Sequence, residues 1–290
     1  MGGTKTLSSV IALALACGCA KGPRPIVVGS KNFTEQLILG EILAQQLERK
    51  LGANVERRLN LGGTLLAHQA LVSGEIDVYP EYTGTALTAI LKQPPAADPK
   101  RVLDEVRSAY EKRWRIEWLA PFGFNNSFAM VVRGDDAKRG GLRTISDAAR
   151  FRKDWAMGAG YEFVERPDGF QGLVQAYWLG IAGQIETMDL GLLYQALEQR
   201  KVDMIAASAT DGMLSVLDVT VLQDDRHYFP PYEAAPVVRA EALAAHPGMR
   251  QALDELAGRL TDKDMQKLNY QLDGKHRPLA DVAREFLERK

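Results

Sequence analysis

The stretch IDVYPEYTGTALTAIL, residues 76–91, predicts a buried strand that passes directly into a helix. Its junction contains Tyr79, Glu81 and Tyr82, followed by a Thr-Gly-Thr triplet. Aliphatic residues would end a buried strand more simply, so the two tyrosines need another explanation. In open α/β sheets, ligands settle beyond the carboxyl ends of the strands, where helices begin. The junction is therefore a candidate small-molecule site.

The same alternation of strand and helix recurs along the chain from residue 25 onward. Short β-branched runs such as PIVVGS, residues 25–30, precede stretches in which apolar residues recur at helical spacing. Strands that alternate with helices of this length predict an α/β fold built on parallel sheets. A second series begins with NNSFAMVVR, residues 125–133. The segment LDVTVLQDDRHYFPPYEAAPVVR, residues 217–239, has the character of a return crossover.

This order of segments predicts two lobes, the second inserted into the first. We expect the first lobe to comprise residues 24–122 and 225–290, and the second to comprise residues 123–224. Two crossovers would then join the lobes, and the ligand cleft would lie between them at the hinge.

Three local assignments bear on the site. WAMGAGYEF, residues 155–163, predicts a strand. TISDAARF, residues 144–151, predicts a helix with Ser146 as its N-cap, and Asn32 or Thr34 is expected to cap the first long helix.

The composition narrows the classes of function. Of the 290 residues, 46% are hydrophobic and 25% are charged, which are ordinary globular values and allow about two domains. The net charge of -1 implies no basic face, so we expect no nucleic-acid partner. The four histidines are scattered without metal-ligand spacing, and we expect neither a metal site nor a cofactor.

The first nineteen residues have the features of a secretory signal. Lys5 precedes an apolar run at residues 10–16, which is too short to span a bilayer, and Cys17-Gly-Cys19 follows. Small residues before a cysteine are typical of a bacterial lipoprotein cleavage site. Cys17 or Cys19 would then carry lipid, although alanine stands three positions before each in place of the usual leucine. The alternative is a frayed N-terminal helix.

Export has consequences for the rest of the chain. We expect the protein in the periplasm or cell envelope, anchored to a membrane by lipid. Both cysteines lie in the N-terminal segment, so the remaining chain has no disulfide and no catalytic thiol.

Polar and aromatic side chains cluster where predicted strands end. Lys31, Thr85 and Arg166 can hold a carboxylate by hydrogen bonds. Tyr82 and Tyr232 can offer ring faces to a quaternary ammonium group, at roughly 0.5–2 kcal/mol per desolvated contact. These residues also have structural interpretations: a tyrosine in an α/β domain is often a packing residue, and Arg166 could form a surface ion pair.

Seven motifs in series resemble one family, the substrate-binding proteins of osmoprotectant ABC importers, which take glycine betaine, choline, carnitine and related compounds. The resemblance runs from about residue 26 to the C-terminus. The motifs are VGSKNFTEQ, DVYPEYTGT, GFNNSFAMVV, ERPDGFQGL, GLLYQAL, ATDG and FPPYEAAPVV.

The resemblance implies a two-lobed periplasmic-binding-protein fold (type II-like), with an aromatic box around the ligand's trimethylammonium group. Carried over by motif, Tyr82 and Tyr232 would be walls of the box, and Asn126 would line the cleft from the second lobe. Lys31, Thr85 and Arg166 would contact the ligand's carboxylate.

Two positions depart from the family pattern. Phe128 replaces a tyrosine in NNSFAM, and Ser208 stands where a tyrosine is expected in ASATDG. The box would then have at most three aromatic walls. A lost ring could cost on the order of 1–2 kcal/mol, roughly tenfold in affinity. Ser208 would either weaken betaine binding or make room for a bulkier or more polar ligand.

The leading hypothesis is an extracytoplasmic binding protein, expected to be monomeric, that closes on a quaternary-ammonium osmoprotectant. It would deliver the compound to an ABC permease and its ATPase. One alternative is a sensory or scaffolding lipoprotein of the same fold that binds a different small zwitterion. The other alternative is an enzyme on this scaffold, but no recognisable catalytic motif supports it.

Overall fold

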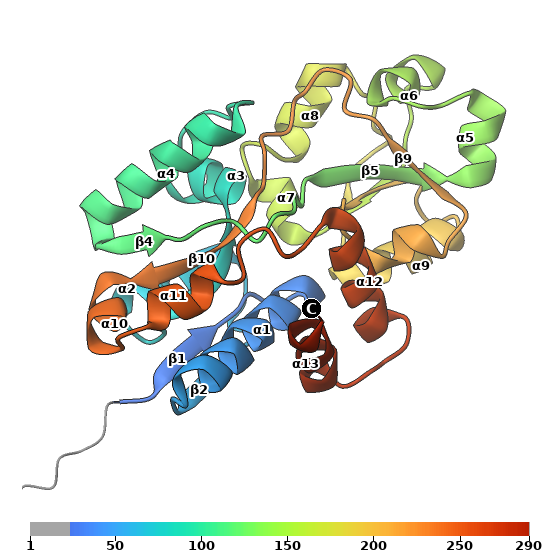
Figure 1. Ribbon diagram of the computed structural model, residues 1–290. Helices are drawn as coiled ribbons and strands as arrows, with labels where there is room; N and C mark the ends of the chain where they lie inside the picture. The colour runs from blue at the N-terminus through green and yellow to red at the C-terminus, as the bar shows by residue number, and fades with distance from the viewer. Residues whose placement is uncertain (1–23, 290) are drawn as a thin grey trace, which may run out of the picture.

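The computed structural model describes residues 24–289 and contains two five-stranded sheets, which form the centres of two lobes (Figure 1). The first sheet has the order β2-β1-β3-β10-β4, with strands β1 (Ile26–Gly29), β2 (Val55–Arg58), β3 (Val78–Tyr82), β4 (Ile116–Trp118) and β10 (Ala234–Arg239). The second has the order β7-β6-β8-β5-β9, with strands β5 (Phe128–Arg133), β6 (Met157–Ala159), β7 (Glu186–Thr187), β8 (Met204–Ser208) and β9 (Val219–Leu222).

Helices surround both sheets. Before β5 and after β10 they are α1 (Thr34–Leu51), α2 (Thr64–Ser73), α3 (Thr83–Thr85), the π-helix η1 (Ala86–Ile90), α4 (Pro99–Trp114), α10 (Ala240–Ala245), α11 (Met249–Asp254), α12 (Asp262–Asp273) and α13 (Leu279–Glu288). Between β5 and β9 they are α5 (Gly134–Gly140), α6 (Ile145–Phe151), α7 (Tyr161–Glu165), α8 (Phe170–Tyr177), α9 (Leu193–Glu198) and the 3₁₀ turns η2 (Leu190–Leu192) and η3 (Gly212–Ser215). Among the described residues, no helix has the length and apolar character needed to cross a bilayer.

The α/β class is confirmed, but the expectation of parallel sheets is wrong, because both sheets are mixed. In the first sheet β1 runs parallel to β2 and β3, whereas β10 runs antiparallel to β3 and β4. In the second, β6 runs parallel to β7 and β8, whereas β5 runs antiparallel to β8 and β9. The reason is that β5 and β10 each follow a crossover from the other lobe. They therefore begin at the inner edge of their sheet, where β3 and β8 end.

This topology gathers four strand ends at the boundary between the lobes. Phe128 at the start of β5 pairs with Ser208 at the end of β8, and Tyr82 at the end of β3 pairs with Ala234 at the start of β10. The crossovers, residues 119–127 and 223–233, run side by side, and Asn125 bridges to Glu233. Residues distant in sequence therefore meet at one place.

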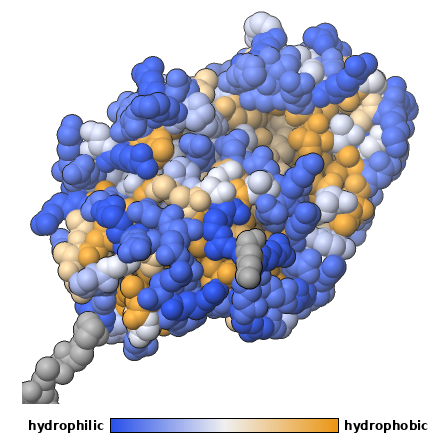
Figure 2. Space-filling model, in the orientation of Figure 1, coloured by the Kyte–Doolittle hydropathy of each residue, from blue (hydrophilic) through white to orange (hydrophobic). Residues whose placement is uncertain are grey.

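A continuous hydrophobic core runs through both lobes. It begins on the inner face of α1, passes through buried rings at the boundary such as Tyr82, Phe124 and Tyr232, and continues to Met130 and Met157 in the second sheet. Separate clusters cover the other face of each sheet. The surface in Figure 2 is mainly hydrophilic, with apolar atoms in smaller areas between.

The three local assignments need correction. Within residues 155–163, the strand ends at Ala159 and α7 begins at Tyr161, because Gly160 separates them. Thr144, not Ser146, caps α6 through a reciprocal capping box with Asp147. Neither Asn32 nor Thr34 caps α1; the N-cap position is Phe33, which makes no side-chain capping hydrogen bond.

The segment expected to be only a return crossover also contributes strands. β9 (Val219–Leu222) pairs with β5 at the edge of the second sheet before the chain turns back. The expected signal segment, with the lipidation candidates Cys17 and Cys19, lies outside the described residues.

Candidate functional site

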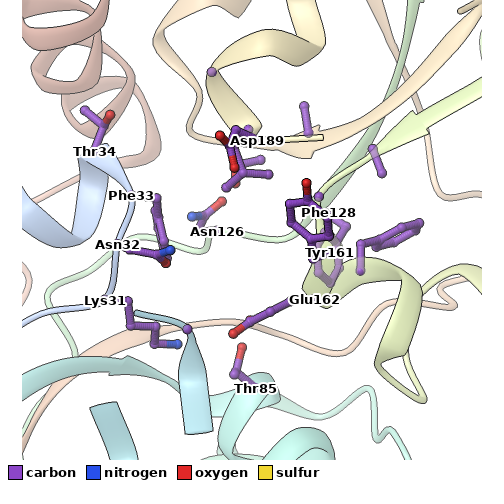
Figure 3. A pocket seen from close by; sticks show the side chains of 18 of the residues that line it. Lys31, Asn32, Phe33, Thr34, Thr85, Asn126, Phe128, Tyr161, Glu162 and Asp189 are labelled. Atoms are coloured by element: carbon purple, nitrogen blue, oxygen red, sulfur yellow. The ribbon is translucent and has the colours of Figure 1, made fainter. Parts of the chain in front are cut away.

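A cavity of about 630 Å³ lies between the lobes, at the edge where the four strands meet (Figure 3). It falls within the usual 300–1,000 Å³ of small-molecule sites. The structure places all eight residues expected at the site along its lining: Lys31, Tyr82, Thr85, Asn126, Phe128, Arg166, Ser208 and Tyr232. The described chain has no cluster of three or more His, Cys, Asp or Glu side chains that could hold a metal ion.

The three residues of the Thr-Gly-Thr triplet after β3, residues 83–85, have different structural roles. The Thr83 hydroxyl donates a hydrogen bond to the Pro231 carbonyl (3.1 Å) and accepts one from the Glu233 amide (3.1 Å), which ties α3 to the second crossover. At Gly84 a Cβ atom would lie only 2.7 Å from the Tyr232 ring, so the position must be glycine. Thr85 faces the cavity.

Tyr82 ends β3 and is almost fully buried. Its ring stacks with Phe33 at a centroid distance of 6.3 Å, and the Lys31 Nζ atom lies 5.0 Å from its centroid. Its hydroxyl donates to the Glu35 carboxylate (2.6 Å). Tyr82 is therefore both a ring in the cavity wall and a hydrogen-bond donor to a buried acid.

Glu35 accepts hydrogen bonds from four parts of the protein. Besides Tyr82, the donors are Asn126 of the first crossover (2.8 Å), Thr210 after β8, and Asn269 of α12 (3.2 Å). Burial raises the pKa of Glu35 above its ordinary value, although these hydrogen bonds oppose the shift. The carboxylate thus connects both lobes behind the cavity.

Phe128 is the centre of an aromatic cluster. Its ring lies 5.6 Å from Tyr232, 4.8 Å from Phe163 of α7 and 5.6 Å from Phe229, measured between centroids. Ser208, its cross-strand partner, contributes a hydroxyl to the cavity lining.

The aromatic lining of the cavity extends beyond the three rings that the sequence assigned to the box. Six aromatic side chains line the cavity: Phe33, Tyr82, Phe128, Tyr161, Phe163 and Tyr232.

Arg166 and Asp168 form a buried ion pair beside this cluster. The guanidinium donates to both carboxylate oxygens (2.9 and 2.6 Å), and Tyr232 and Thr88 donate to the same carboxylate. Burial opposes ionisation of Asp168, yet these contacts keep its pKa below the ordinary value. The remaining nitrogen of Arg166 donates to the Thr85 hydroxyl (2.9 Å), so the ion pair also joins the lobes.

Lys31 is paired in the same way. Its ammonium group donates to Glu81 (2.6 Å) and to the Thr64 hydroxyl (3.1 Å). Across the cleft, Glu162 of α7 accepts hydrogen bonds from the backbone amide and the hydroxyl of Thr64 (2.5 and 3.0 Å). Although burial works against it, Lys31 and these hydrogen bonds lower the pKa of Glu162, which therefore stays ionised.

The electrostatic balance of the cavity is negative. Both cations that line it, Lys31 and Arg166, have carboxylate partners directly behind them, whereas Glu162 and Asp189 add two further negative charges. The site therefore favours a positively charged guest.

Sequence reasoning missed the contributions of Phe33, Tyr161, Glu162, Phe163 and Asp189. Phe33 lies inside the quoted motif VGSKNFTEQ and was available as a signal. Tyr161, Glu162 and Phe163 of α7 were missed because residues 155–163 were all predicted to form a strand. Gly160, which separates the strand from α7, was the available signal for a break at this point.

Two mixed sheets, two adjacent crossovers and a cavity between the lobes define the class of two-lobed ligand-binding proteins. Residues 24–289 match the family described as the substrate binding domain of ABC-type glycine betaine transport system, and the chain belongs to that family. The family is one of transport proteins that work outside the cytoplasm, not of enzymes.

Individual relatives agree with this membership. The chain is 36% identical over 267 residues to the ergothioneine transport permease/ergothioneine binding protein of Helicobacter pylori, a match that covers 92% of this chain but 48% of that protein. It is also 36% identical over 299 residues to the glycine-betaine-binding protein of Pseudomonas aeruginosa, covering 98% and 93%. A crystal structure of a glycine betaine/carnitine/choline ABC transporter aligns with a TM-score of 0.77 at 32% identity, covering 91% and 97%.

Proposed function

We propose that this protein binds a quaternary-ammonium compound between its lobes, with the cation as the main point of recognition. One observation carries the proposal: aromatic rings from both lobes surround a cavity whose own cations are already paired and whose remaining charges are negative. The compounds named for its relatives share a trimethylammonium group, which cannot donate hydrogen bonds and is suited to ring faces.

We assign contact with the cation to the rings of Tyr82, Phe128 and Tyr232, and we add Phe33 because it also lines the cavity. A carboxylate, where the ligand has one, is assigned to the Thr85 hydroxyl and to the N–H groups of Lys31 and Arg166, while Asn126 and Ser208 contact the ligand's body. Because Glu81 and Asp168 already neutralise the two cations, the carboxylate should contribute less than the ammonium group.

Binding is coupled to closure of the lobes about the two crossovers. The closed protein then presents the ligand to an ABC permease and its ATPase. We further propose that the protein is monomeric and is held at the membrane by lipid on Cys17 or Cys19. The second candidate function is sensory: closure of the lobes on the ligand would signal to a partner protein. The contacts between lobes would support this role equally well.

The decisive test compares choline with 3,3-dimethyl-1-butanol, its neutral isostere. Isothermal titration calorimetry at 0.15 M salt should show choline binding at least tenfold more tightly, because only choline carries the charge. Equal affinities would contradict recognition of a cation. Glycine betaine, titrated in parallel, reports the separate contribution of a carboxylate.

A further inference from the structure

Glu81 of β3 lies directly behind the wall of the ligand cavity, next to Tyr82. It is fully buried and is not among the residues that line the cavity, so a ligand does not touch it. Its Oε1 atom accepts hydrogen bonds from the Lys31 ammonium group (2.6 Å) and from the Tyr82 backbone amide (2.7 Å). Glu81 can therefore influence a ligand only through its charge and through the side chain that it holds, Lys31.

Tyr79 fixes the other oxygen of this carboxylate. Its hydroxyl donates to the Oε2 atom of Glu81 (2.9 Å), and the tyrosine is fully buried. The two residues lie on the same face of β3, because side chains alternate along a strand. The contact gives Tyr79 a reason to stand in the stretch IDVYPEYTGTALTAIL, residues 76–91, since it orients the acid behind the site.

The Lys31 ammonium group lies between two acids, one from each lobe. Two of its three N–H groups donate to Glu81 and to the Thr64 hydroxyl (3.1 Å). Thr64 in turn donates to Glu162 of α7, and in Figure 3 the side chains of Lys31 and Glu162 point toward one another. Lys31 is only 2% exposed. Its charge is therefore compensated within the protein.

The charge of Glu81 acts with opposite sign on the two ends of a zwitterionic ligand. A carboxylate that binds Lys31 shares the same nitrogen with Glu81, so two negative groups are brought close together and repel each other. The ammonium end of the ligand is attracted by the same charge. Glu81 should therefore lower the affinity for a carboxylate and raise the affinity for a cation.

We propose that Glu81 is a specificity-determining residue of this protein. Held by Tyr79, it fixes Lys31 and cancels its charge, so that affinity depends on the ammonium end of the ligand and little on a carboxylate. Glu81 acts through Lys31 and is therefore a positioning residue. The inference rests on the proposed function, because it requires a quaternary-ammonium ligand in the cavity beside Lys31.

The test replaces Glu81 by glutamine, which has nearly the same shape. In Glu81→Gln the amide oxygen can replace Oε1 and keep the hydrogen bonds from Lys31 and Tyr82, while the amide N–H group donates to the Tyr79 oxygen. Only the negative charge is lost. Titration calorimetry with choline and glycine betaine should show weaker choline binding. The ratio of glycine betaine affinity to choline affinity should rise roughly tenfold or more.

Two controls separate the effect of charge from damage to the fold. 3,3-Dimethylbutanoate has the carboxylate and the shape of glycine betaine without the positive charge, and its affinity should rise in Glu81→Gln. Damage to the fold would lower it. Glu111→Gln, at an exposed position on α4 outside the cavity lining, should leave the ratio of affinities unchanged.

A double variant carries the test if Glu81→Gln does not fold. Lys31→Gln with Glu81→Gln removes one charge of each sign, so choline affinity should stay within about twofold of that of the original protein. If choline affinity instead rises roughly tenfold, the Lys31 charge reaches the ligand and the Glu81 charge does not, and the inference is overturned.

The outcomes distinguish this inference from the proposed function. If choline and glycine betaine bind the original protein, and Glu81→Gln changes both affinities by the same factor or neither, Glu81 does not determine specificity and the proposed function stands. If neither compound binds the original protein, the proposed function fails, and the role of Glu81 fails with it.

Discussion

Tyr82 shows how one side chain serves two sites in this protein. Its ring lines the ligand cavity, and its hydroxyl is one of four donors to the buried Glu35. The ring was predictable from its position at the end of a strand. The acid was not, because Glu35 lies 47 residues away in sequence and meets Tyr82 only through the packing of α1 against the first sheet.

The two tasks of Tyr82 can be separated by two substitutions. Tyr82→Ala removes the ring and should weaken choline binding by roughly 0.5–2 kcal/mol, whereas Tyr82→Phe keeps the ring and should cost less. Calorimetry on both variants measures the difference. Tyr270→Ala, on α12 outside the cavity lining, is the matched control. Equal losses in Tyr82→Ala and Tyr82→Phe would mean that the hydroxyl, and not the ring, determines binding.

Arg166 stabilises the fold, which its sequence context did not reveal. Asp168 is fully buried and depends on the guanidinium for its charge compensation. Arg166→Met should therefore destabilise the protein by about 3–5 kcal/mol, which chemical denaturation can measure. The double substitution Arg166→Met with Asp168→Leu removes both charges and should recover much of this loss. If the single variant is as stable as the original protein, the ion pair is unimportant for folding.

At the scale of elements, the sequence predicted where strands and helices alternate better than how strands pair. Periodicity reports which face of a segment is buried, and it located β3 and α1. The direction of β5 and β10 depends on which lobe the chain has just left, which no local pattern records. The same limit explains α7, where five residues are too few to show helical periodicity.

Helix α2 offers a test of pH dependence. His68 is buried against the rings of Tyr110 and Trp114 (5.4 and 4.6 Å), and burial lowers its pKa to about 4 from an ordinary 6.5. The unfolded chain therefore takes up the proton first as pH falls. The stability that His68 contributes is full above pH 6.5 and is lost progressively as the pH falls toward 4.

Between pH 7 and pH 5 this loss should amount to about 1 kcal/mol after allowance for partial solvent contact. Urea denaturation at both pH values measures it. His68→Gln, which cannot titrate, should lose less stability over the same interval. An unchanged pH dependence in that variant would show that His68 is not the group responsible.

At the scale of the whole molecule, contacts between lobes surround the cavity. Glu162 accepts from Thr64, Arg166 donates to Thr85, and α12 reaches η3 of the second lobe, with Gln266 donating to the Ala209 carbonyl (2.9 Å). The sequence predicted two lobes and a cleft. It did not predict these contacts, because each pairs residues that are 57 or more positions apart.

The contact between Glu162 and Thr64 should shift the balance between open and closed forms. Glu162→Ala should raise the radius of gyration of the ligand-free protein in small-angle X-ray scattering and weaken choline binding severalfold, because closure loses two hydrogen bonds. Saturating choline should restore the compact value. Glu165→Ala, an exposed residue on the same helix, is the control. An unaltered radius in Glu162→Ala would remove this contact from the closure mechanism.

The pairing of the two crossovers has a consequence for how such proteins diversify. The Asn126 amide donates to the Tyr232 carbonyl (3.1 Å), so the chain enters and leaves the far half at neighbouring points. The second lobe could therefore be cut out at the two crossovers and replaced by the second lobe of a relative. The first lobe would keep both of its connection points. New ligand preferences could then be acquired as a module wherever the grafted half keeps the contacts between lobes, such as that of Arg166 with Thr85.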